Sequence, residues 1–172
     1  MWALASAFID IALHRSGPDR LPASRFLLIV VLAIYFPVNF LRLYVSGPAT
    51  RLELIFIVAD TALFFGFVYA VLGFFRFRPR FLQTACALLG TDVLINIIGL
   101  PIAAGGSAAT AGTGPATVFS ILYLVLFIWW IDIAGFIISR AVEQPYVVGI
   151  MFVIFYVIAA LSILTAVTQA PT

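Results

Sequence analysis

The sequence predicts an all-α fold: a polytopic transmembrane bundle of five helices preceded by a short interfacial amphipathic helix. The composition, the length of the apolar segments and the breaks between them support this prediction. Of the 172 residues, 65% are apolar and 9% are charged, whereas soluble domains are about 45–50% apolar and about 25% charged. A soluble fold could not cover so much apolar surface. The few charges also exclude a disordered chain and a nucleic-acid-binding protein.

Five apolar segments are each long enough to cross a bilayer. Each has about 23 residues and reaches roughly 35 Å at the rise of an α-helix, against a hydrocarbon core of about 30 Å. The segments are continuously apolar, without the alternation of outer-membrane strands. Short Gly-Pro, Arg-rich and Gly-rich stretches separate them. Within a single integral membrane domain, residues 1–172, the predicted spans are residues 24–45, 52–75, 81–104, 116–139 and 145–167.

The first 16 residues predict a helix that lies in the membrane interface and does not cross it. Ser6, Asp10 and His14 follow at intervals of four and therefore share one helical face. The apolar run is too short to span, and Asp10 interrupts it. No basic residue precedes the run, so a cleavable signal is not expected.

The distribution of arginine predicts the orientation of the chain. Only Arg42 and Arg51 lie in segments on the side of the membrane opposite the N-terminus. Cytoplasmic segments carry an excess of basic residues, so we predict a multi-pass protein of the bacterial inner membrane. Its N-terminus would be cytoplasmic and its C-terminus periplasmic. The arginines on the N-terminal side are Arg15, Arg20, Arg25, Arg76, Arg78, Arg80 and Arg140.

Three aspartates lie within a turn or two of mid-membrane, where an ionised carboxylate costs about 2.5–3.5 kcal/mol on the insertion scale. Since all nine arginines lie near helix ends, each acid must face the interior, pair with a polar group or be protonated. Asn96 follows Asp92 by one turn on the same face. Two interpretations stay open: structural hydrogen bonds between helices, or a site for protons, a cation or a small polar ligand. The predicted intramembrane polar cluster consists of Asp60, Asp92, Asn96 and Asp132.

The connection between the second and third spans is basic. Arg76, Arg78 and Arg80 alternate with phenylalanine and proline at the cytoplasmic end of a span. Such a segment sets topology and also attracts anionic headgroups, by about 1 kcal/mol per arginine. We therefore predict contact with the lipid bilayer and its anionic headgroups here. Three charges at a membrane surface do not predict a nucleic-acid site.

Small residues occupy a narrow arc of the second span. They are Ala59, Ala62, Gly66, Ala70 and Gly73. Such a seam allows close approach of two helix backbones. We expect the seam to pack within the same chain. The alternative is contact with a membrane-protein partner or with a second copy of the chain.

Motifs for metals, cofactors and catalysis are missing from the sequence. The single histidine, His14, cannot form a multi-histidine metal or haem site, and the single cysteine, Cys86, cannot form an intramolecular disulfide. No Walker A, G-x-S-x-G or H-E-x-x-H pattern occurs. We therefore expect no metal, no cofactor and no enzymatic activity. A lipid-active enzyme is disfavoured because the acids lie too deep for headgroup chemistry.

Two stretches, together with the helix count and the basic turns, carry a family resemblance. They are PDRLPASRF at residues 18–26, before the first span, and RPRFLQT at residues 78–84, opening the third. With these features the chain resembles the bacterial Yip/Yif-type family of small five-helix integral membrane proteins. The resemblance implies no enzymatic activity and no catalytic residues. We expect a non-enzymatic protein that acts through helix packing or partner binding. A small transporter or channel that uses the mid-membrane acids is the alternative.

Overall fold

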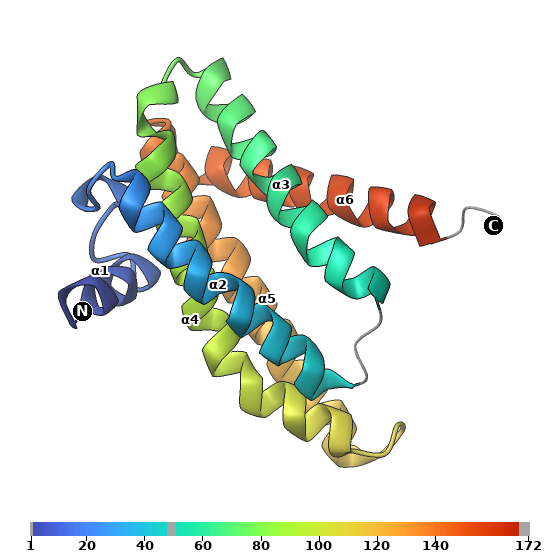
Figure 1. The fold of residues 1–172 in the computed structure, drawn as a ribbon. Helices are drawn as coiled ribbons and strands as arrows, with labels where there is room; N and C mark the ends of the chain where they lie inside the picture. Colours follow the sequence, from blue (N-terminus) through green and yellow to red (C-terminus); the bar gives the residue numbers. More distant parts are fainter. Residues whose placement is uncertain (1, 48–50, 169–172) are drawn as a thin grey trace.

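The computed structural model describes residues 2–47 and 51–168. Within these residues the chain is helical and has no strand, so the all-α prediction is confirmed. Figure 1 shows the arrangement of the α-helices. The elements are α1 (Trp2–Ala12), η1 (Pro18–Arg20), α2 (Arg25–Ser46), α3 (Arg51–Phe74), η2 (Arg78–Arg80), α4 (Phe81–Ala108), α5 (Gly114–Ala141) and α6 (Tyr146–Thr168).

Five helices, α2 to α6, are long and apolar enough to cross a membrane. The bounds of α2, α3 and α6 each differ from the predicted spans by one residue. This agreement has a physical cause, since unpaired backbone groups are costly in hydrocarbon and force the whole apolar segment into a helix. Helices α4 and α5 have 28 residues each and are longer than predicted.

The extra turn of α4 comes from the glycine-rich stretch that the sequence predicted as a loop. Helix α4 continues through Gly105 and Gly106 and ends at Ala108. A Cβ atom at Gly105 would stand under 3.0 Å from the ring of Phe119 on α5. The missing side chain therefore lets α5 pack closely on α4. This tertiary contact compensates for the low helix propensity of glycine.

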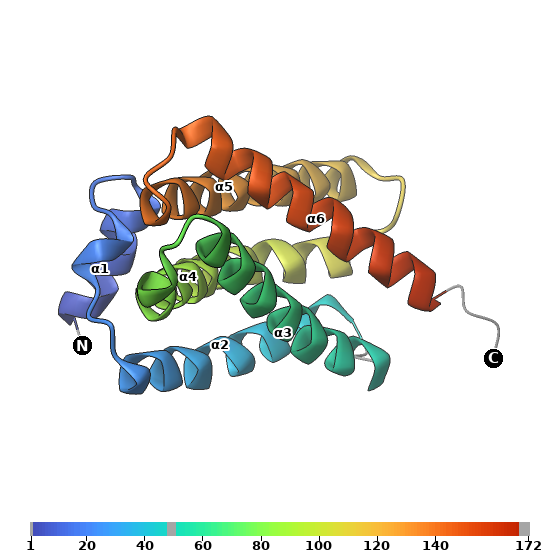
Figure 2. The ribbon, with the colours of Figure 1, turned by 90° about the horizontal axis from the view of Figure 1, so that it is seen from above.

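Helix α4 is the central element of the fold. Helices α2 and α5 pack along it, and α1 lies against the half of α4 nearer its N-terminus (Figure 1). Helix α6 begins on α5 and then runs away from the bundle. It meets α3 on the way (Figure 2). Helices α2, α4, α5 and α6 thus pack closely in succession, and α3 is attached more loosely, to α4 and α6.

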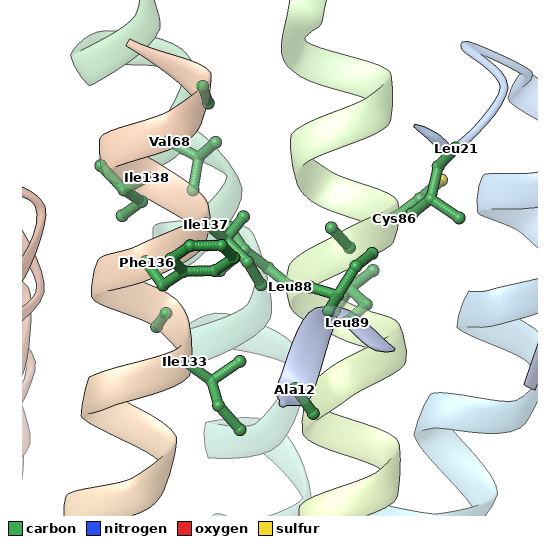
Figure 3. Close-up of a cluster of buried hydrophobic side chains, with 14 of the residues drawn as sticks. Ala12, Leu21, Val68, Cys86, Leu88, Leu89, Ile133, Phe136, Ile137 and Ile138 are labelled. Atoms are coloured by element: carbon green, nitrogen blue, oxygen red, sulfur yellow. The ribbon is translucent and has the colours of Figure 1, made fainter. Parts of the chain in front are cut away.

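The apolar core lies at the end of the bundle that carries α1, η1 and the turn between α5 and α6. Figure 3 shows side chains from α1, α3, α4 and α5 converging there. Cys86 and Ile137 are fully buried, and Leu89 is almost so. Val68 and Ala12 close the cluster from α3 and α1. Helix α1 is therefore attached to the bundle by apolar packing.

Helix α1 is too short to cross a membrane, as predicted, but it is more than a surface element. Its 11 residues end at Ala12. Ile11 is fully buried, and the ring of Phe8 occupies the space that a side chain at Gly90 of α4 would fill. Leu4, Ile9 and Leu13 are partly exposed, but the position of α1 in the interface stays a prediction.

The small-residue face of α3 does not pack within the chain, so that expectation was wrong. Ala59, Ala62, Gly66 and Ala70 are exposed, and a Cβ atom at Gly66 would meet nothing within 4 Å. Only Gly73 is covered, by the side chain of an arginine in η2. Helix α3 instead turns its larger aliphatic side chains toward the core. These are Val68, Val71 and Leu72.

Candidate functional site

A polar cavity of about 350 Å³ lies between α2, α3, α4 and α5. The cavity lies within the candidate membrane-spanning part of the bundle, because every residue of its wall belongs to a candidate span. Apolar and aromatic side chains make up part of the wall. The polar lining residues are Tyr35, Asn39, Arg42, Asp60, Asp92, Asn96, Tyr123 and Trp130.

Asp92 of α4 lies in a network of hydrogen-bond donors. Asn96, one turn later, donates from Nδ2 to Asp92 Oδ2 at 2.7 Å and to the backbone oxygen of Asp92 at 3.0 Å. Asn39 of α2 and Trp130 of α5 lie beside the same carboxyl. Asn39 also donates to the backbone oxygen of Tyr35 at 3.1 Å, which fixes its amide. The predicted pairing of Asp92 with Asn96 is thus present, and two further helices contribute to it.

Asp60 of α3 faces the same cavity from the opposite wall. The hydroxyl of Tyr156 on α6 donates to Asp60 Oδ1 at 2.6 Å. Asp60 is otherwise exposed, since α3 stands away from the core. The neighbouring Thr61 is buried and donates to the hydroxyl of Tyr35 at 3.4 Å. Among the described residues, Asp60 thus has Tyr156 as its side-chain partner, and it also lines the cavity.

Arg42 brings a positive charge to the cavity that the sequence did not predict. Its backbone lies in the last two turns of α2, but its long side chain reaches inward and lines the cavity. The guanidinium donates from Nη1 to the hydroxyl of Tyr123 on α5. Its Nε is buried and has no hydrogen-bond partner among the described residues. The expectation that no arginine reaches the acids was therefore wrong.

Asp132 does not join this cluster, which corrects the prediction of a single group of acids. It lines a separate pocket with His14 and Tyr146. His14 Nε2 lies 3.2 Å from Asp132 Oδ2, and the hydroxyl of Tyr146 donates to Oδ1. Trp130, two residues earlier, faces the central cavity. Two residues turn an α-helix by about 200°, so Asp132 points to the other side of α5.

The three arginines of the basic connection have different surroundings. Arg80 Nη2 lies 2.5 Å from Glu143 Oε1, and Nη1 donates to the backbone oxygen of Ala141 at 3.1 Å. Arg80 therefore ties η2 to the turn between α5 and α6. Arg78 lies over the ring of Tyr69, with 5.3 Å from Cζ to the ring centroid. Arg76 is exposed, and contact of Arg76 and Arg78 with anionic lipid stays a prediction.

The residues that sequence reasoning missed are mostly tyrosines and charged residues near the ends of helices. Tyr123 and Tyr156 are partners of Arg42 and Asp60, yet each appears in the sequence as one aromatic residue among many apolar ones. His14 was noted for the face of α1, but its partner Asp132 is far away in the chain. In the described ranges no group of three or more His, Cys, Asp or Glu side chains could hold a metal ion.

Comparison with known proteins found no match: no family model, no curated protein and no solved structure resembles the chain significantly. The resemblance to the Yip/Yif-type family therefore stays a prediction.

Proposed function

We propose that this polytopic membrane protein is a non-enzymatic carrier for a small solute that bears a positively charged group. The protein would act in the bacterial inner membrane, with its N-terminus in the cytoplasm. The observation that carries the proposal is the presence of two carboxyl groups, those of Asp60 and Asp92, in one intramembrane cavity. Ionisable residues inside membrane spans are costly and mark ligand or ion pathways by default.

The charge and shape of the cavity favour a cationic solute. One guanidinium, from Arg42, faces two carboxyl groups, so the cavity has an excess of acidic groups. Aromatic rings of Phe127 and Trp130, stacked with centroids 6.1 Å apart, form part of the same wall. Carboxylates and aromatic faces together bind ammonium groups, through charge and cation–π attraction. Arg42 would contact an acidic or polar end of the same solute.

A second cavity suggests a route to the site. It measures about 640 Å³ and lies between the C-terminal part of α4 and the N-terminal part of α5. Tyr123 lines both this outer cavity and the central one. In the predicted orientation the outer cavity opens toward the periplasm. The hydrogen bond between Arg42 and Tyr123 would then separate the site from the outside.

The test is flux into proteoliposomes that contain the purified full chain, with radiolabelled methylammonium and tetramethylammonium as probes. Asp92→Asn and Asp60→Asn each remove a negative charge from the cavity while keeping the shape of the side chain. We expect each to reduce flux by roughly tenfold or more, as expected for loss of a charge-assisted contact. Asp132→Asn is the matched control, because Asp132 lies in a different pocket. Unchanged flux in Asp92→Asn and Asp60→Asn, or equal loss in the control, would contradict the carrier function.

A second candidate function is partner binding through α3, in line with the expectation of a non-enzymatic protein that acts through helix packing or partner binding. The open small-residue face around Gly66 favours it, because such a face lets another helix approach closely. A Gly66→Cys variant, oxidised in membranes, would form a disulfide-linked dimer if a second copy packs there. Native Cys86 is buried and would not react. A monomer under these conditions would exclude self-association through this face.

A further inference from the structure

The pocket that contains Asp132 lies at the end of the bundle where α1 meets α5 and the α5–α6 turn. Its volume is about 490 Å³, and it shares no lining residue with the central cavity. Its occupancy is therefore independent of the carrier function. The polar residues of its wall are His14, Asp132, Ser139, Arg140, Gln144 and Tyr146.

The single acid of this pocket is already engaged. Asp132 accepts a hydrogen bond from Tyr146, and His14 Nε2 lies 3.2 Å from its other oxygen. His14 is held in place by stacking on Phe136, with ring centroids 4.2 Å apart. Its φ of +58° is one that non-glycine residues rarely adopt. The fold thus directs the one carboxylate of the pocket toward protein partners.

Arg140, by contrast, has no ionic partner in the described ranges. Its guanidinium lies over the Phe136 ring, with 5.4 Å from Cζ to the centroid. The nearest acid in the sequence is Glu143, which pairs with Arg80 at 2.5 Å. Asp132, the acid of the same pocket, is bonded to Tyr146 and His14. Arg140 therefore lines the pocket without an ion pair in the described ranges, while Asp132 is held toward its own partners.

Hydrogen bonds to three carbonyl groups in the last turn of α5 reduce the repulsion that this helix end exerts on an anion. The carbonyl groups at a helix end carry partial negative charge, which normally repels anions. Here the last carbonyl groups already accept hydrogen bonds. The backbone N–H of Val142 bonds the oxygen of Ile138, that of Gln144 bonds the oxygen of Ser139, and Arg80 bonds the oxygen of Ala141.

We propose that this pocket binds a phosphate group. The guanidinium of Arg140 can donate two parallel hydrogen bonds to phosphate oxygens, and the amide of Gln144 provides a further donor from the adjoining turn. Arg140 is the penultimate residue of α5, at an end of a candidate span, where lipid headgroups lie. A phospholipid headgroup and free phosphate present the same chemistry to these donors.

The test is binding to the delipidated full chain in neutral detergent, measured by native mass spectrometry. The probes are phosphatidylglycerol, diacylglycerol with the same acyl chains, and inorganic phosphate. We expect Arg140→Gln to weaken binding of the phosphate-bearing probe by roughly tenfold or more. Gln144→Leu, in an exposed turn, should weaken it by a smaller factor. Arg25→Gln is the matched control, since Arg25 is an exposed arginine at the same end of the bundle.

The arms distinguish the sources of the phosphate. If the protein binds phosphatidylglycerol but not diacylglycerol, the ligand is the phosphate of a lipid headgroup. If it binds inorganic phosphate but neither lipid, the ligand is free phosphate. Both results support the pocket, provided that Arg140→Gln weakens the binding by roughly tenfold or more and the variant keeps the helical content of the wild type. The proposal is overturned by three outcomes: equal binding of diacylglycerol, equal loss in Arg25→Gln, or no binding of either phosphate-bearing probe. If Arg140→Gln unfolds, Gln144→Leu decides the question.

Discussion

The hydroxyl of Tyr156 on α6 lies 2.6 Å from Oδ1 of Asp60 on α3. This hydrogen bond joins α6 to α3, the more loosely attached of the two helices. Phe64 and Phe67 of α3 pack against the same tyrosine, with ring centroids 5.0 and 5.2 Å away. The contact therefore positions Asp60 on the wall of the central cavity.

Replacing Tyr156 with phenylalanine should loosen this contact without creating a cavity, because the ring is kept. We expect the free energy of unfolding to fall by about 0.5–1.5 kcal/mol, the usual net value of one hydrogen bond. Unfolding of the detergent-solubilised protein by a denaturing detergent would measure it. Tyr44→Phe is the control, since Tyr44 is 75% exposed. Equal stability of Tyr156→Phe and wild type would show that ring packing alone holds α3 to α6.

Gly149→Ala should separate α6 from α5. A Cβ atom at Gly149 would stand under 3.0 Å from the backbone oxygen of Gly135, and a backbone atom cannot move aside as a flexible side chain can. We expect a loss of about 1–3 kcal/mol or more, typical of overpacking. The readout is the midpoint of thermal unfolding in detergent.

The matched control for Gly149→Ala is Gly66→Ala, also a glycine within a candidate membrane span. Nothing lies within 4 Å of a Cβ atom at Gly66. Alanine has a higher helix propensity than glycine, so this variant should be neutral or stabilised by up to about 1 kcal/mol. A large loss at Gly66 would mean that another molecule covers this face in the sample.

Gly90→Ala should weaken the attachment of α1. The added Cβ atom would overlap the ring of Phe8, which would push α1 away from α4. Trypsin should then cleave faster after Arg15, in the turn that follows α1. A double variant that carries both Gly90→Ala and Phe8→Ala lacks the overlap. It should therefore be cleaved at about the same rate as the single variant Phe8→Ala. Unchanged cleavage in Gly90→Ala would show that the ring moves without displacing the helix.

The predicted orientation can be tested with reporter fusions. The excess of seven arginines over two predicts that the C-terminus lies in the periplasm. A reporter that matures only in the periplasm should be active when fused after the last residue and silent when inserted after Gln144, between α5 and α6. The opposite pattern would mean that the N-terminus lies outside the cytoplasm.

Helix number and most helix bounds followed from the sequence because the bilayer imposes them. An apolar segment of sufficient length must form a complete helix to satisfy its backbone, whatever its neighbours are. The pairing of Asp92 with Asn96 followed for the same local reason, since residues four apart on a helix lie together. The extension of α4 through Gly105 depended on Phe119 of another helix, so local propensity could not reveal it.

The rotation of each helix about its own axis could be known only from packing. Helices α3 to α6 are apolar on nearly every side, so their sequences carry little amphipathic signal for the face that turns inward. Helix packing turned Asp60 and Asp92 toward one cavity and Asp132 toward another, and left Gly66 facing outward. The inward reach of Arg42 likewise depends on the position of α5, because its partner Tyr123 is 81 residues away in the chain.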